Sequence, residues 1–197
     1  MSSEKKRCHW CNGDPLYEDY HDNEWGVPNF DDKSLFEFLL LEGAQAGLSW
    51  ITILRKRESI KKASSQLSAE KIARYRPAKI EHLMQNEGII RHRLKIESTV
   101  TNAKAYLQLQ ESVGSFSDYV WQFVDGKPLQ NRFRTGKQVP ATTKASEQMS
   151  KTLKKDGFRF VGPTICYAYM QATGMVNDHV VGCYRHDVCR ELGADRL

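Results

Sequence analysis

The stretch that decides the fold reads Asp156-Gly157-Phe158-Arg159-Phe160-Val161-Gly162-Pro163-Thr164. It follows a basic segment ending in Lys154 and Lys155, and it precedes an apolar segment. Glycine permits a tight turn and proline suits the first position of a helix, so Gly162 and Pro163 predict that a helix begins here. We therefore expect two helices joined by a hairpin near residues 157–165.

This hairpin admits two interpretations. Backbone N–H groups at the start of the second helix can receive a phosphate, in which case Arg159, Gly162 and Thr164 would lie beside a DNA backbone. That is the arrangement of a helix-hairpin-helix, which holds DNA without reading its bases. A Gly-Pro turn also occurs in ordinary αα-hairpins, and the spacing alone does not separate the two.

Helical periodicity extends outward from the hairpin over most of the chain. Asp31 and Asp32 can cap a helix that is apolar on nearly every side through residues 35–41, which predicts a central position for it. Further helices are expected from Ser49 to Ala63, from Ser68 past Ile72, from Pro77 to Gly88, along Ile96, Val100, Ala103 and Leu107, and from about Ser146 to Lys155.

Residues 125–144 are polar and rich in turn residues, so we expect a loop there. No stretch of the chain alternates with the period of two that marks a strand. The 197 residues are therefore predicted to be all-α, a single domain over residues 1–197. We expect two interleaved helical lobes, with both termini in one of them.

The composition is that of a soluble globular protein, with 40% hydrophobic and 27% charged residues. The longest apolar run, residues 38–41, is far too short to span a bilayer, and no secretory signal is visible. We therefore expect a cytoplasmic protein that acts as a monomer.

Charge is unevenly distributed along the chain. Residues 14–42 hold nine acidic residues and a single basic one, Lys33, although the whole chain has a net charge of +5. Basic clusters therefore fill the remainder, including residues 55–57, residues 91–93 with Lys95, and residues 151–155. Such clusters suit a polyanion, or they are simply solvated helix faces.

Five cysteines without a secretory signal argue for metal binding rather than disulfides. His179 and Cys183 are one helical turn apart and can converge on one ion. Cys8 and His21 can supply the other two ligands of a structural zinc site joining the N- and C-terminal segments. Spacing leaves competing ligands open, namely His9, Cys11, His186 and Cys189, as well as the alternative of buried thiols and ordinary surface histidines.

Glu42 directly follows the apolar run at residues 38–41. A carboxylate in that position is expected to be drawn out of water, where it requires a partner. The aromatic residues Tyr17, Tyr20, Trp25 and Trp50 lie outside any long regular stripe. Aromatic faces and a buried carboxylate together suit a cationic base with N–H donors. In the other interpretation Glu42 bonds to nearby backbone N–H groups and the aromatic residues are core.

At these residues the sequence resembles the type I, constitutive bacterial 3-methyladenine DNA glycosylases. The resemblance covers nearly the whole chain and is carried by several long segments in the same order. They are Asp14-Pro15-Leu16-Tyr17, residues 20–28 (Tyr-His-Asp-Asn-Glu-Trp-Gly-Val-Pro), residues 41–52 (Leu-Glu-Gly-Ala-Gln-Ala-Gly-Leu-Ser-Trp-Ile-Thr), Gly88-Ile89-Ile90-Arg91-His92-Arg93, and Phe160-Val161-Gly162 through to residues 177–183 (Asn-Asp-His-Val-Val-Gly-Cys).

The resemblance implies a helix-hairpin-helix DNA glycosylase fold and assigns roles to particular residues. The metal ligands it implies are Cys8, His21, His179 and Cys183, around one structural Zn²⁺. The catalytic residues it implies are Glu42, Tyr17 and Tyr20, and the base-binding residues are these three together with Trp50. Gly47 and Leu48 fall where family members approach or fill the gap left by a flipped base.

One position differs from the wider superfamily, and another differs from some relatives within the family. In the wider helix-hairpin-helix superfamily a Val-Asp-Thr-His-Val segment supplies a catalytic aspartate, and that position here is Asn177, as the resembling family leads us to expect. Asp178 is one residue further on and should point elsewhere. Ala44 stands where some relatives would have Gln.

The implied activity is monofunctional hydrolysis of the N-glycosidic bond of 3-methyladenine in alkylated double-stranded DNA. It releases free 3-methyladenine and leaves an abasic site. One alternative is a relative with a shifted lesion preference, for which Ala44 is a candidate cause. The other is a non-catalytic module that binds damaged DNA, which would not need an intact set of Glu42, Trp50 and the two tyrosines.

Overall fold

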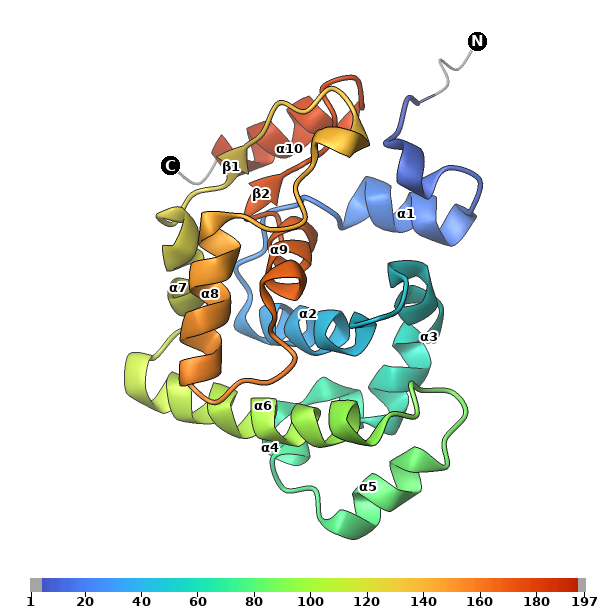
Figure 1. Cartoon of the computed structure of the whole chain (residues 1–197), viewed down its shortest axis with the longest axis vertical. Helices are drawn as coiled ribbons and strands as arrows, with labels where there is room; N and C mark the ends of the chain where they lie inside the picture. Colours follow the sequence, from blue (N-terminus) through green and yellow to red (C-terminus); the bar gives the residue numbers. More distant parts are fainter. Residues whose placement is uncertain (1–4, 195–197) are drawn as a thin grey trace.

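The computed structural model describes residues 5–194, which form a helical molecule with very little strand (Figure 1). This confirms the all-α prediction. The helices are α1 (Pro15–Asn23), α2 (Asp32–Gln45), α3 (Trp50–Ala63), α4 (Ala69–Ile72), α5 (Pro77–Met84), α6 (Arg93–Val113), α7 (Phe116–Trp121), α8 (Lys144–Lys155), α9 (Pro163–Ala172) and α10 (Arg185–Ala194). Each predicted helix is present, although α5 ends at Met84, before Gly88.

Helix α2 is central, as its apolar sequence predicts. Residues 38–43 are all buried, and the helix packs against α3, α6, α7 and α9. Asp31 caps it by accepting a hydrogen bond from the backbone N–H of Ser34 at 2.8 Å. Asp32 instead holds the start of another helix, because its carboxylate accepts from the backbone N–H groups of Phe116 (3.0 Å) and Ser117 (2.7 Å).

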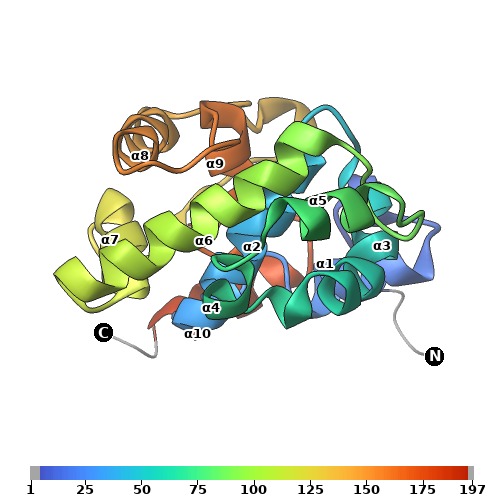
Figure 2. The same cartoon turned by 90° about the horizontal axis from the view of Figure 1, so that it is seen from below.

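The long helix α6 runs along one side of the molecule beside α4 and α5, as Figure 2 shows. Of the stripe predicted for it, Ile96 and Ala103 are buried, whereas Val100 and Leu107 are half-buried. Ile96 joins a small apolar cluster beneath α5, which is separate from the main core around α2.

Helices α8 and α9 form the predicted hairpin and pack against each other. Helix α8 starts two residues before the predicted Ser146, because Thr143 and Ser146 form a reciprocal capping box. Pro163 is the first residue of α9, as predicted. The side chain of Asn102 on α6 holds the connecting loop, accepting from the N–H of Arg159 (2.7 Å) and donating to its carbonyl (3.0 Å).

Residues 125–143 form a loop that contains a 3-10 turn, Gly136–Gln138, and a short strand, neither of which the sequence predicted. Strand β1 (Leu129–Gln130) pairs in parallel with β2 (Val176–Asn177). Two residues are too few to show any periodicity, so this pairing leaves no sequence signal. Through this pairing the loop packs against the segment that precedes α10. The same segment also contacts the N-terminal residues, because the N–H of Tyr184 donates to the carbonyl of Lys6 at 3.0 Å. Within residues 5–194 no helix is long and apolar enough to cross a bilayer.

Candidate functional site

A cavity of about 920 Å³ opens between α1, the end of α2, the start of α3, and α9. The N-terminal segment and the loop around residue 136 complete its wall. Its lining includes Trp10, Tyr17, Tyr20, Trp25, Glu42, Gln45, Trp50, Arg134, Lys137, Gln171, Asp178 and Val180. The predicted pocket residues Glu42, Tyr17, Tyr20 and Trp50 are thus brought together on one cavity from three different helices.

Glu42 is the most unusual group in this wall. It lies in the last turn of α2, is 2% exposed, and its Oε2 atom has no hydrogen-bond partner. Burial raises the pKa of Glu42 to about 8. The interpretation in which this carboxyl is satisfied by backbone N–H groups is wrong for Oε2, which is left available to a ligand with a donor.

The aromatic residues surround this carboxyl. Tyr20 and Trp50 are buried and their ring centroids are 5.4 Å apart, while the indole N–H of Trp50 is buried without an acceptor. Tyr17 is half-buried one helical turn before Tyr20. Burial is the main cause of the raised pKa at both tyrosines, and the Glu42 carboxylate adds to it at each, which reflects how close the three groups are.

Trp10 is a site residue that sequence reasoning missed. Its ring centroid lies 4.7 Å from that of Tyr17 and 5.0 Å from that of Trp25, and it forms part of the cavity wall. It belongs to the short 3-10 turn His9–Cys11, outside every periodic segment. A tryptophan two residues after a candidate metal ligand, Cys8, was the available signal.

The N-terminus of α1 sets the direction of its two tyrosines. The Asp14 carboxylate caps the helix by accepting from the N–H groups of Leu16 (3.0 Å) and Tyr17 (3.2 Å), and Pro15 occupies the first helical position. Tyr17 and Tyr20 are three residues apart and so share one face, towards the cavity. His21, the next residue, points to a second site.

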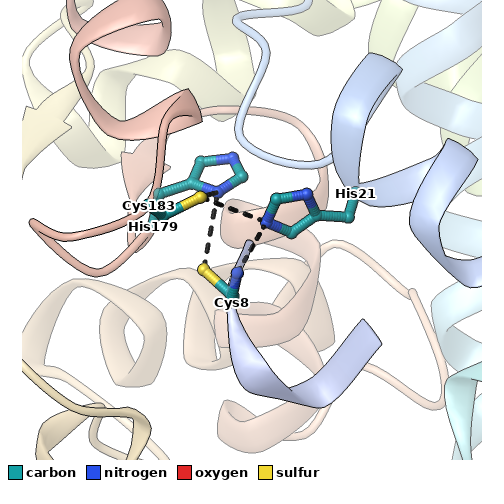
Figure 3. Close-up of side chains that lie close together, drawn as sticks. All are labelled: Cys8, His21, His179 and Cys183. Carbon is teal, nitrogen blue, oxygen red and sulfur yellow. Dashed lines mark hydrogen bonds between the residues drawn. The ribbon is translucent and has the colours of Figure 1, made fainter. Parts of the chain in front are cut away.

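This second site brings together Cys8, His21, His179 and Cys183 (Figure 3). All four are buried and their candidate ligand atoms lie within 4.8 Å of one another. The Cys183 sulfur is 3.4 Å from His21 Nε2 and 3.6 Å from His179 Nδ1, and the Cys8 sulfur is 3.7 Å from His179 Nδ1. Hydrogen bonding with Cys8 lowers the pKa of Cys183, so the cluster favours a thiolate. The four residues lie close enough to hold a metal ion.

In both histidines, the ring nitrogen that does not face the cluster also has a hydrogen-bond partner. His21 Nδ1 lies 2.9 Å from Asp22 Oδ1, and His179 Nε2 lies 2.9 Å from the carbonyl oxygen of Trp25. A carboxylate or a carbonyl on the far side of the ring is the usual partner of a metal-bound histidine, because it fixes the ring and its tautomer.

The competing ligands are not members of this cluster. Cys11 donates its S–H to the carbonyl of Cys8, and His186 lies between the carbonyl of Asn131 and Asp187. His9 is exposed, and Cys189 is buried among other residues. The structure therefore separates the four converging residues from the alternatives that spacing left open.

Asn177 and Asp178 lie between the two sites, and one of them differs from what we expected. Asn177 faces away from the cavity, donating to Gln130 and to the carbonyl of His186. Asp178, which was expected to point away from the site, lines the cavity. It is 2% exposed, and its carboxylate accepts hydrogen bonds from Asn131, Tyr167 and Gln171, at 2.6 to 2.8 Å. The expectation was wrong because residues 176–177 are extended rather than helical.

The predicted DNA-contact residues are all at the surface, in two loops. Gly47 and Leu48 lie in the exposed turn between α2 and α3, and Leu48 is 42% exposed. Arg159 and Thr164 are exposed in the hairpin loop and at the start of α9, with Gly162 as the N-cap residue. Ala44 is not part of the cavity wall, so nothing in the structure supports a lesion preference set by that residue.

Comparison with known proteins agrees with this geometry. The chain is 53% identical over 178 residues to DNA-3-methyladenine glycosylase 1 of Escherichia coli, which covers 90% of this chain and 95% of that protein. It is 50% identical over 177 residues to the DNA-3-methyladenine glycosylase of Haemophilus influenzae, covering 90% and 96%.

Solved structures give the same result. A crystal structure of 3-methyladenine DNA glycosylase I matches with a TM-score of 0.91 at 51% identity, over 92% of this chain and all of that one. The Staphylococcus aureus enzyme, studied for its recognition of 3-methyladenine, matches with a TM-score of 0.89 at 36% identity, over 93% and 98%. The family model for methyladenine glycosylases covers residues 10–186, so this chain belongs to the methyladenine glycosylase family.

Proposed function

We propose that this chain is a DNA-3-methyladenine glycosylase that hydrolyses the N-glycosidic bond of 3-methyladenine in alkylated double-stranded DNA. It releases the free base, leaves an abasic site, and needs no covalent enzyme intermediate. The observation that carries the proposal is the unpartnered oxygen of Glu42, buried in an aromatic cavity. The close relatives named for this activity support it.

Recognition of the base follows from the groups left without partners. A methylated adenine in DNA is cationic and carries N–H donors, which Glu42 Oε2 accepts. Trp50 stacks on the base, and Tyr17 and Tyr20 shape the cavity wall, where aromatic faces attract a cation. Because the cation favours the ionised carboxyl, its arrival lowers the raised pKa of Glu42. An uncharged adenine would leave Glu42 with no such compensation.

The chemistry depends on this recognition more than on a strong acid or base. The glycosidic bond of a cationic base is already labile, and interactions that stabilise the departing base lower the barrier to its departure. Water then adds at the sugar carbon. Glu42 therefore acts as the recogniser of the leaving base, and activation of water is not assigned to it.

The DNA is held by the two surface loops. Flipping a base costs a few kcal/mol, least where the base is damaged. Gly47 and Leu48 fill the gap that the base leaves. The start of α9, at Gly162 and Thr164, receives a backbone phosphate with Arg159 beside it.

The metal proposed for the four-residue cluster is one structural Zn²⁺ per chain. Two thiols and two imidazoles are a common zinc donor set, and tetrahedral Zn²⁺ with ordinary bond lengths places sulfur and nitrogen ligands about 3.6 Å apart. The distances of 3.4 to 3.7 Å in this cluster fit that separation. Bound there, Zn²⁺ would join the N-terminal segment to the segment before α10, and it takes no part in the hydrolysis.

The activity is tested by incubating the purified chain with methylated duplex DNA and measuring released bases by chromatography. Release of 3-methyladenine, with an abasic site and no strand cleavage, is the expected result. Binding to methylated DNA without any release would identify a damage-binding module instead. Release mainly of other alkylated purines would support a shifted lesion preference. Sedimentation of the same sample tests the proposal that it is a monomer, and cell fractionation tests cytoplasmic location.

A further inference from the structure

The exposed turn between α2 and α3 has a defined backbone geometry. The N–H of Leu48 donates to the carbonyl of Gln45 at 2.6 Å, Ala46 has φ −44° and ψ 116°, and Gly47 has φ +77°. These are the features of a type II turn, in which the third residue must have a positive φ. A Cβ atom at Gly47 would meet nothing within 4 Å, so glycine is required there for its backbone angle alone.

Lys95, in the first turn of α6, reaches this turn from inside the protein. It is 8% exposed, and its ammonium donates to the carbonyls of Ala44 (2.8 Å) and Ala46 (2.5 Å). The basic neighbours Arg91 and Arg93 have about half of their side chains exposed. The assignment of Lys95 to a basic surface cluster is therefore wrong, because this lysine points inward.

The two carbonyls have different roles. That of Ala44 belongs to the last turn of α2, where carbonyls lack helical partners and the helix dipole favours a cation. That of Ala46 belongs to the central peptide of the turn, whose orientation distinguishes a type II turn from type I. If this peptide flipped, its carbonyl would turn away and the buried ammonium would lose an acceptor, which is costly. Lys95 thus favours one of the two orientations.

We propose that Lys95 is a positioning residue for base flipping, which fixes the turn so that Leu48 is held ready to enter the gap left by the flipped base. The inference rests on the proposed function, because Leu48 has this task only in a glycosylase that acts on duplex DNA. Lys95 is not among the residues that line the cavity, so it does not contact the base. Its loss should therefore impair the handling of duplex DNA and leave the base pocket intact.

The test compares base release from methylated duplex and methylated single-stranded DNA under single-turnover conditions. A single strand has no stacked gap to fill, so the ratio of the two rates isolates the contribution of the turn. We expect Lys95→Met to lower the duplex rate by about tenfold or more, as expected when a positioning contact is lost. The single-strand rate and the affinity for free 3-methyladenine should change by less than about twofold. Lys104→Met, which removes an exposed lysine of the same helix, should change none of these quantities.

A double-mutant comparison links the effect to Leu48. Leu48→Gly should lower the duplex rate in the same selective way, and Lys95→Met should add little to it, because both substitutions remove one function. Equal losses on both substrates, no loss on either, or independent effects of the two substitutions would overturn the proposal. If Lys95→Met does not fold, Lys95→Gln, which keeps one donor group, replaces it, and the same ratio decides. A wild-type chain that releases no base from either substrate would instead refute the proposed function.

Discussion

At the scale of a single residue, the position of Glu42 in the fold determines its hydrogen bonding and its pKa. The sequence places a carboxyl directly after an apolar run, and the structure shows one of its oxygens buried without a partner. Its raised pKa means that the neutral form of this carboxyl persists to a higher pH in the folded protein than in an ordinary glutamate. Ionisation of Glu42 should therefore be linked both to substrate recognition and to stability.

The first prediction concerns the pH dependence of activity. In the proposed mechanism the carboxylate form of Glu42 accepts a hydrogen bond from the base. Because kcat/KM reflects the ionisation of the free enzyme, kcat/KM should then rise with pH up to about 8 and level off. Glu42→Gln cannot ionise and should show no such rise. Initial rates on methylated duplex DNA between about pH 6 and pH 9 measure both profiles. A wild-type profile that is flat, or that falls over this range, would refute the assignment.

A second prediction concerns the pH dependence of stability. Between the ordinary pKa of 4.5 and about 8, the unfolded chain has lost the Glu42 proton while the folded chain keeps it. The folded state thus binds more protons, so rising pH lowers the free energy of unfolding by about 1.4 kcal/mol per unit from this group. Glu42→Gln should gain stability relative to wild type as the pH rises over this window. Urea unfolding at about pH 5 and pH 8 tests the sign.

Several residues of the site were beyond sequence reasoning for physical reasons. Trp10 lies in a three-residue turn without periodicity. Lys95 was assigned to a surface cluster, because a single sequence does not show that two carbonyls of α2 and the following turn face it. The direction of Asp178 depends on a strand of two residues. Each of these depends on packing between segments distant in the chain.

At the scale of elements, prediction was more successful, because helix caps and apolar stripes are local. The starts of α2, α3, α4 and α5 were predicted from Asp31, Ser49, Ser68 and Pro77. The same rules failed where an apparent capping residue serves another helix. Asp32 follows the cap of α2 in sequence, yet its carboxylate binds the first N–H groups of α7.

Asp32 therefore provides a test at this scale. Asp32→Ala leaves the N–H groups of Phe116 and Ser117 without their acceptor, and it should lower the free energy of unfolding by about 1–3 kcal/mol. Excision rates below the unfolding transition should stay close to wild type, because Asp32 is absent from the cavity wall. Glu58→Ala, at an exposed position on α3, serves as the control and should change stability by less than about 0.5 kcal/mol. Equal stabilities for the two variants would show that Asp32 does not anchor α7.

The proposed contact between the α8–α9 hairpin and the DNA backbone is tested by removing the positive charge of Arg159. Arg159 is exposed in the loop, so Arg159→Ala should weaken binding to any duplex DNA and reduce the slope of log K against log salt by about 1. The rate of base release from the bound complex should not change. Lys33→Ala, at an exposed position within the acidic segment, should leave the slope as it is. An unchanged slope for Arg159→Ala would exclude a phosphate contact there.

At the scale of the whole molecule, the cluster of Cys8, His21, His179 and Cys183 joins distant parts of the chain. Cys8 and His21 come from the first segment, and His179 and Cys183 from the last. Tyr20, which lines the cavity, is adjacent to His21 on α1, so the cluster also fixes one wall of the base pocket. Stability and base binding should therefore both depend on the metal.

Metal removal tests this dependence. The purified chain should contain one zinc, and Cys183→Ser, like prolonged chelation, should lower the midpoint of thermal unfolding and weaken binding of 3-methyladenine. Cys166→Ser removes a buried thiol outside the cluster and should retain the zinc. A well-folded wild-type chain with much less than one zinc would refute the structural role.

We propose above all that the buried carboxyl of Glu42 recognises the departing base. The most direct test is the single-turnover rate of 3-methyladenine release from methylated duplex DNA, measured for wild type and for Glu42→Gln at about pH 8. Glutamine has a similar shape but carries no charge, so we predict a fall of about 10²-fold or more, as when a charged contact to the transition state is lost. Full retention of the wild-type rate by Glu42→Gln would show that the charge of Glu42 does not assist departure of the base.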